Sequence, residues 1–368
     1  MKIDRIELIH CRVPLVEPFR ISSGAVAEKD GIVVRVVTDV GVGHGESSPM
    51  TGAFYGADTP ESCWKELSES LAPAMVGAGF TNVLDAAAHV GTLAASNFSR
   101  TGLETAFWDI EAQRQGKPLY ELLGGSKVDV PSGLAVGLYD DVKDLLRAIE
   151  RYRPDGYKRF KIKIERGRDV ELVKAVRQEF GDIPLYVDAN CAYDLTDLEI
   201  FRRLDEFNLM MFEQPFAGGA LKELAVLQSQ VRTPVCLDES LESVEDTAEA
   251  IRLGSFRIGN IKIQRVGGFG NALKIHDMCQ AAGIPVWMGT MPELGVGCVQ
   301  GLHMATLPNC KFPTDVEAST RWFRDDIIAP FLEVRDGILN LPDTPGLGFT
   351  VDDAKLDKYV VARQSFGG

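Results

Sequence analysis

Five charged residues recur at a nearly constant interval through the middle of the chain and could act together in catalysis. Each lies within or just after a short apolar run, and about 25 residues separate one from the next. Carboxylates at three of these positions and amines at the other two suit general acid–base chemistry assisted by a hard metal ion. The five residues are Lys163, Asp188, Glu213, Asp238 and Lys262.

The three acids predict a metal site. Carboxylates that converge on one pocket repel one another unless a cation neutralises them, because unpaired buried charge costs several kcal/mol. Asp188, Glu213 and Asp238 offer only oxygen donors, without a thiol or an imidazole. Such a set suits a hard octahedral ion, so we expect Mg²⁺, for which Mn²⁺ can substitute. The alternative for each acid alone is that it caps a following helix or pairs with a lysine.

The two lysines are expected to face each other across this metal. Lys163 and Lys262 belong to the second and sixth of eight apolar runs, which are four apart in a closed ring. The α-carbon of a metal-bound carboxylate would then lie between two amines, one to remove a proton and one to return it. Lys161 shares the inward face with Lys163 because side chains alternate along a strand, and its charge, with that of the metal, should lower the Lys163 pKa. A solvated lysine pair at a strand edge is the alternative for Lys161 and Lys163.

Alternating strands and helices would position these residues. Between the apolar runs, the segments place apolar residues at the i, i+3, i+4 spacing of amphipathic helices. Eight strand–helix units of about 25 residues describe an α/β barrel in which the carboxyl ends of the strands surround the active site. Because the last helix is poorly marked, we expect a modified TIM barrel, (β/α)7β. The runs lie near residue 135 and at 161–164, 185–190, 210–215, 235–240, 260–263, 286–289 and 311–315.

The first third of the chain is typical of a separate α+β domain. Residues 3–12 and 32–38 predict strands, and Thr59-Pro60-Glu61 opens an amphipathic helix that runs towards Met75. The glycine-rich stretch 41–56 lacks the pattern of a phosphate-binding loop, so we interpret it as turns and flexible loops. We expect this α+β domain over 1–125, the barrel over 126–325, and a C-terminal segment over 326–368 that returns to the first domain.

Composition and charge exclude several classes of protein. A chain of 368 residues with 45% hydrophobic and 25% charged residues is neither disordered nor membrane-spanning. The net charge of -14, without a basic stripe, argues against a nucleic-acid partner. The N-terminus lacks the apolar core of a signal peptide, so we expect a cytoplasmic protein. The seven cysteines have no zinc-site spacing and are expected to be buried free thiols.

Six motifs spread along the chain read AFWDIEAQRQGKPLYELLGG at 106–125, KIK at 161–163, VDAN at 187–190, EQP at 213–215, LDES at 237–240 and NIKIQRVGG at 260–268. With these motifs the chain resembles the enolase superfamily, in its muconate lactonizing enzyme subgroup, over almost its whole length. The stretch 18–24 (PFRISSG), the loop 50–55 and the stretch 307–327 are most similar to the N-succinylamino acid racemase/o-succinylbenzoate synthase branch. Two features depart from that branch: Ala135 replaces a common serine, and 289–295 reads GTMPELG.

The resemblance implies a Mg²⁺-dependent enzyme that removes the proton α to a carboxylate through an enediolate. Racemisation or epimerisation of N-succinylamino acids and o-succinylbenzoate synthesis are the activities it most favours, while a muconate-type cycloisomerase and a dipeptide epimerase stay open. The first domain would then cap the barrel mouth, with two loops, near 19–24 and 47–56, that set specificity. The expected substrate-binding residues are Phe19, Ser22, Met50, Tyr55, Met288 and Glu293.

Two further residues and two other classes of protein stay open. Asn190 and Glu239 could orient the metal ligands from behind, or simply cap the following helices. A Schiff-base aldolase would also place a lysine in a barrel, but it has no use for three phased carboxylates. A non-catalytic binding protein on this fold would not need both lysines and all three acids. The enzyme interpretation expects a small-molecule carboxylate, no nucleic-acid or membrane partner, and a homo-oligomer.

Overall fold

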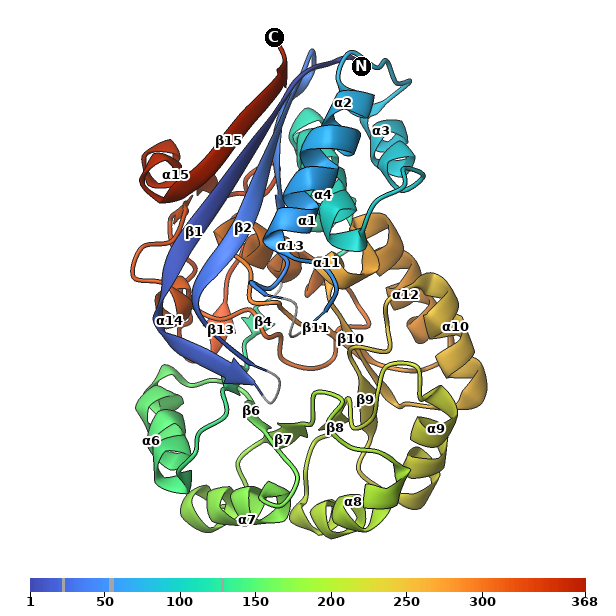
Figure 1. Ribbon diagram of the computed structural model, residues 1–368, viewed down its shortest axis with the longest axis vertical. Helices are drawn as coiled ribbons and strands as arrows, with labels where there is room; N and C mark the ends of the chain where they lie inside the picture. The colour runs from blue at the N-terminus through green and yellow to red at the C-terminus, as the bar shows by residue number, and fades with distance from the viewer. Residues whose placement is uncertain (22–23, 53–55, 127–128) are drawn as a thin grey trace.

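The computed structural model, which describes residues 1–21, 24–52, 56–126 and 129–368, has an N-terminal sheet standing over a curled parallel sheet (Figure 1). The N-terminal sheet is antiparallel and consists of β1 (Ile3–Ile21), β2 (Gly24–Thr38) and β3 (Gly41–Ser47). The last strand of the chain, β15 (Val360–Gly367), pairs with β1, so the C-terminal segment returns to the first domain.

The helices of the N-terminal domain cover one face of this sheet. Its long helix α4 (Asn97–Arg114) packs closely against β3. A Cβ on Gly43 or Gly45 would lie about 2 Å from the carbonyl oxygen of Ala106 or Gly102, respectively. The glycines at 43 and 45 therefore belong to a strand and permit close packing, which corrects the expectation of turns and loops there. The helices are α1 (Pro60–Glu66), the π-helical η1 (Leu67–Leu71), α2 (Ala72–Met75), α3 (Val83–Val90), α4 (Asn97–Arg114) and α5 (Leu119–Leu122).

The helix expected to open at Thr59 begins there. The Thr59 side chain accepts a hydrogen bond from the backbone N–H of Ser62, and Pro60 occupies the first turn, where no N–H is needed. The helical course continues through α1, η1 and α2 to Met75, as the apolar spacing predicts.

The second sheet has seven parallel strands in sequence order, each near a predicted apolar run. Buried residues fill these strands, and the connections carry helices on the outside, visible as a ring around the strands in Figure 1. The strands are β5 (Leu134–Val136), β6 (Phe160–Lys163), β7 (Leu185–Asp188), β8 (Phe212–Glu213), β9 (Val235–Leu237), β10 (Ile258–Ile261) and β11 (Val286–Met288). The helices are α6 (Val142–Tyr152), α7 (Asp169–Phe180), α8 (Leu198–Leu204), α9 (Leu221–Gln230), α10 (Val244–Leu253), α11 (Ile263–Val266), α12 (Phe269–Ala281), α13 (Gly295–Met304) and α14 (Ser319–Trp322).

The predicted eighth strand, 311–315, closes the ring through single bridges instead of a regular ladder. Cys310 bridges Val286 on one side, and Thr314 bridges Ser132 on the other, both in parallel orientation. A regular ladder is interrupted at Pro313, which has no N–H to donate. The modified (β/α)7β barrel with an N-terminal capping domain is thus confirmed, with its eighth strand joined to its neighbours by these bridges and by separate backbone hydrogen bonds, such as that from Asp315 N–H to Met288 O. The domain boundaries at 125 and 325 remain predictions.

The C-terminal segment adds small pairings beneath and beside the barrel. Its elements are β12 (Ile328–Ala329), which pairs with β14 (Thr350–Val351); β13 (Ile338–Leu339), which pairs with β4 (Val130–Pro131); and α15 (Asp353–Tyr359). Short 3₁₀ turns are η2 (Arg153–Asp155), η3 (Leu195–Asp197) and η4 (Asp205–Phe207). All seven cysteines are free thiols, five of them buried. No helix among the described residues is long and apolar enough to cross a membrane.

Candidate active site

The five phased residues converge at the carboxyl ends of the parallel strands. Lys163, Asp188 and Glu213 are the last residues of β6, β7 and β8, and they lie in register, Lys163 opposite Asp188 and Asp188 opposite Glu213. Asp238 and Lys262 directly follow β9 and β10. All five side chains are buried. The constant spacing in the sequence therefore corresponds to one layer of the barrel.

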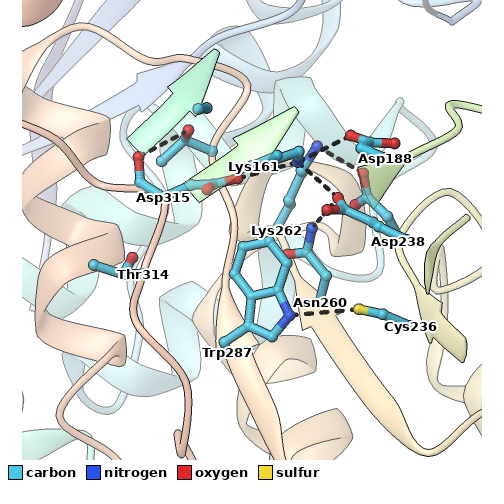
Figure 2. A network of polar contacts seen from close by, with 12 residues as sticks. Lys161, Asp188, Cys236, Asp238, Asn260, Lys262, Trp287, Thr314 and Asp315 are labelled. Carbon is cyan, nitrogen blue, oxygen red and sulfur yellow. Dashed lines mark hydrogen bonds and ion pairs between the residues drawn. The ribbon is translucent and has the colours of Figure 1, made fainter. Parts of the chain in front are cut away.

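Lysine ammonium groups pair with the carboxylates of this layer (Figure 2). Lys161 Nζ lies 2.8 Å from Glu213 Oε1 and 3.0 Å from Asp188 Oδ2. Lys163 Nζ donates to Asp188 Oδ2 at 2.6 Å, and Lys262 Nζ donates to Asp238 Oδ2 at 2.9 Å. Arg265 forms an ion pair with the other oxygen of Asp238. The cluster thus alternates cations and anions across the barrel.

The acids of the cluster respond differently to burial. Burial opposes ionisation of Asp188, but Lys161 and Lys163 outweigh it and lower the Asp188 pKa to about 2. Lysine and arginine neighbours likewise lower the Asp238 pKa against the effect of burial. For Glu213, burial and then the charge of Asp188 raise the pKa, in spite of Lys161. Glu213 is therefore the acid whose charge is least compensated.

The donor set of these three acids fits a divalent cation. In the part of the chain that the structure describes, no three Asp, Glu, His or Cys side chains are already arranged as a metal cage. The carboxylate oxygens are instead paired with ammonium groups. However, Glu213 Oε2 is buried without a hydrogen-bond partner, and a buried acceptor left unsatisfied is costly. Three carboxylates on neighbouring strands, with one oxygen left unpartnered, offer the oxygen donors that a hard ion prefers.

A pocket opens above this cluster, between the barrel mouth and the N-terminal domain. Lys161, Lys163, Lys262 and Asn190 form part of its polar wall. Its apolar wall includes Phe19 and Met50, the two described residues that we expected from the capping loops. The structure brings the lysines and these loop residues to one cavity. The remaining lining residues are Ala135, Thr290, Met291, Pro292, Asp315 and Trp322.

The two residues expected behind the ligands lie next to them. Asn190 Nδ2 donates to Asp188 Oδ2 at 3.3 Å and to Glu239 Oε1 at 3.2 Å, so the amide links the two acids. The backbone N–H of Asn190 also donates to Asp188 Oδ1 at 2.9 Å. These contacts hold the Asp188 carboxylate in place. Helix capping, the alternative for both residues, is not what the structure shows, since their side chains bind within the cluster.

Two of the expected substrate-binding residues lie elsewhere. Met288 packs in the main core because side chains alternate on β11, where the neighbouring Trp287 faces the barrel interior. Glu293 is buried beside the start of α13, where a Cβ on Gly297 would strike its side chain, and it does not line the pocket. The chain from Thr290 to Pro292 forms the wall instead. Ser22 and Tyr55 lie outside the described residues.

Several residues of the site, most of them polar, were not predicted from the sequence. Arg159 and Asn260 precede Lys161 and Lys262 by two positions, so the alternation that identified Lys161 could have found both. Asn260 donates to Glu213 Oε1 at 3.1 Å. Asp315 is the last residue of the eighth apolar run, so its position at the end of a predicted strand could have identified it. Trp322 gave no such signal, because it comes from α14, which follows the last barrel strand.

Known families and proteins match this chain over most of its length. Residues 5–124 match the mandelate racemase / muconate lactonizing enzyme N-terminal domain, and residues 144–355 match the enolase C-terminal domain-like family. The chain is 41% identical to an o-succinylbenzoate synthase from Geobacillus stearothermophilus, over 98% of this chain and 96% of that protein. It is 38% identical to an N-succinylamino acid racemase from Amycolatopsis sp, over all of both chains. An enolase superfamily structure from Listeria innocua superposes with a TM-score of 0.94, at 33% identity, covering 100% of this chain and 99% of that one.

Proposed function

We propose, from the premise that the chain belongs to the mandelate racemase/muconate lactonizing enzyme family of the enolase superfamily, that this enzyme removes the proton α to a substrate carboxylate. We infer that it racemises N-acylated amino acids, N-succinyl derivatives above all, or forms o-succinylbenzoate by dehydration, or does both. The observation that carries the proposal is that Lys163 and Lys262 line one pocket from β6 and β10, which are separated by three strands.

Asp188, Glu213 and Asp238 would hold Mg²⁺, or Mn²⁺ in its place. When bound, the ion would supply positive charge that balances the negative charge growing on the substrate carboxylate as the α-proton leaves. The all-oxygen donor set and the unpartnered Oε2 of Glu213 support this assignment.

The lysines would move the protons. In racemisation, the neutral amine of one lysine takes the α-proton at its Nζ, and the ammonium of the other donates a proton to the opposite face of the same carbon. In dehydration, Lys163 first takes the α-proton and then returns it to the departing hydroxide, which leaves as water. Lys262 stays cationic throughout and stabilises the developing charge.

The pocket walls support a small, partly apolar substrate. Phe19 packs edge-on against Trp322, with ring centroids 5.0 Å apart, and both line the pocket. Met50 and Met291 extend this wall in a small apolar cluster. The relatives carry the names of enzymes that act on succinylated compounds, which supports an acyl chain along this wall. A cytoplasmic location and a homo-oligomeric state are parts of the same proposal.

Incorporation of solvent deuterium at the α-carbon tests the proposal. The full chain with Mg²⁺ is incubated in D2O with N-succinylamino acids, other N-acylamino acids, dipeptides and cyclohexadiene carboxylates, and exchange is followed by proton NMR. We expect exchange with at least one N-acylamino acid, or water loss from the cyclohexadiene, and neither in the Lys163→Ala/Lys262→Ala double variant. Equal exchange by the double variant would contradict the proposal.

A further inference from the structure

A buried arginine lies in the barrel beneath the pocket and binds an acid that the reaction does not use. Arg159 is fully buried, and its guanidinium lies over the rings of Tyr186 and Trp287, 4.8 Å from each centroid. Its Nη2 donates to Asp315 Oδ1 at 2.5 Å. A cation enclosed in this way needs a carboxylate partner, and Asp315 supplies it.

The other oxygen of Asp315 faces Lys161. Lys161 Nζ donates to Asp315 Oδ2 at 3.3 Å, while the same ammonium reaches Glu213 and Asp188 on its other side. Figure 2 shows Lys161 between Asp315 on one side and Asp188 on the other. Backbone contacts fix Asp315, whose N–H donates to Met288 O at 3.0 Å. Lys161 therefore has three carboxylate partners, of which two belong to the proposed metal site.

These contacts create a competition. A divalent cation and an ammonium cannot both take the oxygens of Asp188 and Glu213 without repulsion, because like charges at this distance in a buried site interact strongly. Asp315 is the partner of Lys161 that lies outside the metal ligands, and Arg159 holds it in place. It can keep the ammonium when the metal takes the other two acids.

We propose that Asp315, held by Arg159, is a positioning residue that draws the Lys161 ammonium away from Asp188 and Glu213 and so favours metal binding there. This inference rests on the metal site of the proposed function. It assigns no proton transfer to Asp315, which acts through Lys161. If Asp315 served only to pair with Arg159, its substitution would not change the affinity for the metal through Lys161.

Calorimetric titration of the full chain with Mg²⁺ tests the inference without a substrate. We expect Asp315→Asn to weaken Mg²⁺ binding by about tenfold or more, the usual effect of losing a residue that orients metal ligands. In a Lys161→Met background, where the ammonium that Asp315 would draw away is absent, the same substitution should change the affinity by less than about twofold. Asp315→Glu, which keeps the carboxylate, should retain most of the affinity.

A matched control is Asp326→Asn. Asp326 is also buried, but it accepts from Ser319 and the backbone of Gly295, away from Lys161. Thermal unfolding of each variant checks that it is folded. If Asp315→Asn does not fold, Asp315→Glu is tested in its place. Asp326→Asn should bind Mg²⁺ like the wild type.

The outcomes separate this inference from the proposed function. Unchanged Mg²⁺ affinity in Asp315→Asn, or an equal loss with and without Lys161, overturns the role of Asp315 and leaves the metal site standing. If Asp315→Glu is the variant tested, a Mg²⁺ affinity far below that of the wild type, both with Lys161 present and in the Lys161→Met background, likewise overturns the role of Asp315. Absence of Mg²⁺ binding by the wild type overturns both proposals.

Discussion

Lys163 and Lys262 line the same pocket but bind different carboxylates, Asp188 at 2.6 Å and Asp238 at 2.9 Å. Each lysine is therefore oriented by its own acid, on its own side of the barrel. A substitution at one lysine leaves the partner of the other in place. The two amines can therefore be removed one at a time by substitution.

Removal of metal should abolish activity. Chelation with EDTA is expected to eliminate turnover of the best substrate, and Mg²⁺ or Mn²⁺ should restore it, because both ions accept oxygen ligands. The measurement is the rate before chelation, after chelation and after add-back. Full activity after exhaustive chelation would remove the metal from the mechanism.

Substitution of Glu213 by glutamine should weaken the binding of Mg²⁺. The change removes a buried carboxylate oxygen that has no other partner, and we expect a loss of affinity of about 10- to 100-fold, measured by calorimetry. Glu104→Gln is the matched control, since Glu104 is an equally buried acid that binds the backbone of Phe269 and Gly270. Equal affinities in the wild type and Glu213→Gln would exclude Glu213 as a ligand.

The Phe19 ring should influence which acyl chains are accepted. Its edge-on contact with Trp322 closes the apolar wall of the pocket, so Phe19→Ala opens space beside the distal part of a substrate. We expect kcat/KM to fall several-fold for short acyl chains and less for long ones. Phe80→Ala, in the N-terminal domain beside His89, controls for loss of an aromatic ring. Parallel changes across the acyl series would contradict the placement of Phe19 at the substrate.

The free energy of unfolding of the protein should depend on pH through the titration of Glu104. Burial raises the pKa of Glu104 from its ordinary 4.5 to about 7, although the N–H groups of Gly270 and Phe269 donate to it. Between these values the folded state keeps a proton that the unfolded state has lost, so this residue's contribution to the free energy of unfolding falls as pH rises from 4.5 to 7. Glu104→Gln cannot titrate.

Denaturant unfolding of the wild type and Glu104→Gln across pH 4.5 to 8 measures this contribution. As pH rises from 4.5 to 7, the free energy of unfolding of the wild type should fall relative to that of Glu104→Gln by on the order of 1 to 3 kcal/mol. Above pH 7 the difference between the two proteins should level off. Other titrating groups cancel because both proteins carry them. A difference that does not vary with pH would contradict the raised pKa.

The layer of charged residues could be predicted from the sequence because one physical rule determines it. Each strand–helix unit has nearly the same length, so equal spacing in the chain places Asp188 and Glu213 opposite each other in the barrel. Side-chain alternation then added Lys161. Both rules are local and need no knowledge of the packing between distant elements.

The remaining site residues depend on packing that the sequence pattern does not encode. Trp322 reaches the pocket from a short helix after the last barrel strand, and Phe19 meets it from the other domain. Glu293 was wrongly expected at the pocket because the turn after β11 directs its side chain towards the start of α13. Such positions follow from the contact between two domains, and not from any periodicity.

The central claim, that Lys163 and Lys262 act on opposite faces of one α-carbon, is tested most directly by deuterium exchange with single enantiomers. Wild type, Lys163→Ala and Lys262→Ala are each incubated in D2O with the separate L and D forms of the best N-acylamino acid. Both variants should lose racemisation by about 10²- to 10⁴-fold, and residual exchange should favour one enantiomer in Lys163→Ala and the other in Lys262→Ala. Racemisation at close to the wild-type rate in either variant would contradict the two-base arrangement and favour a one-base reaction.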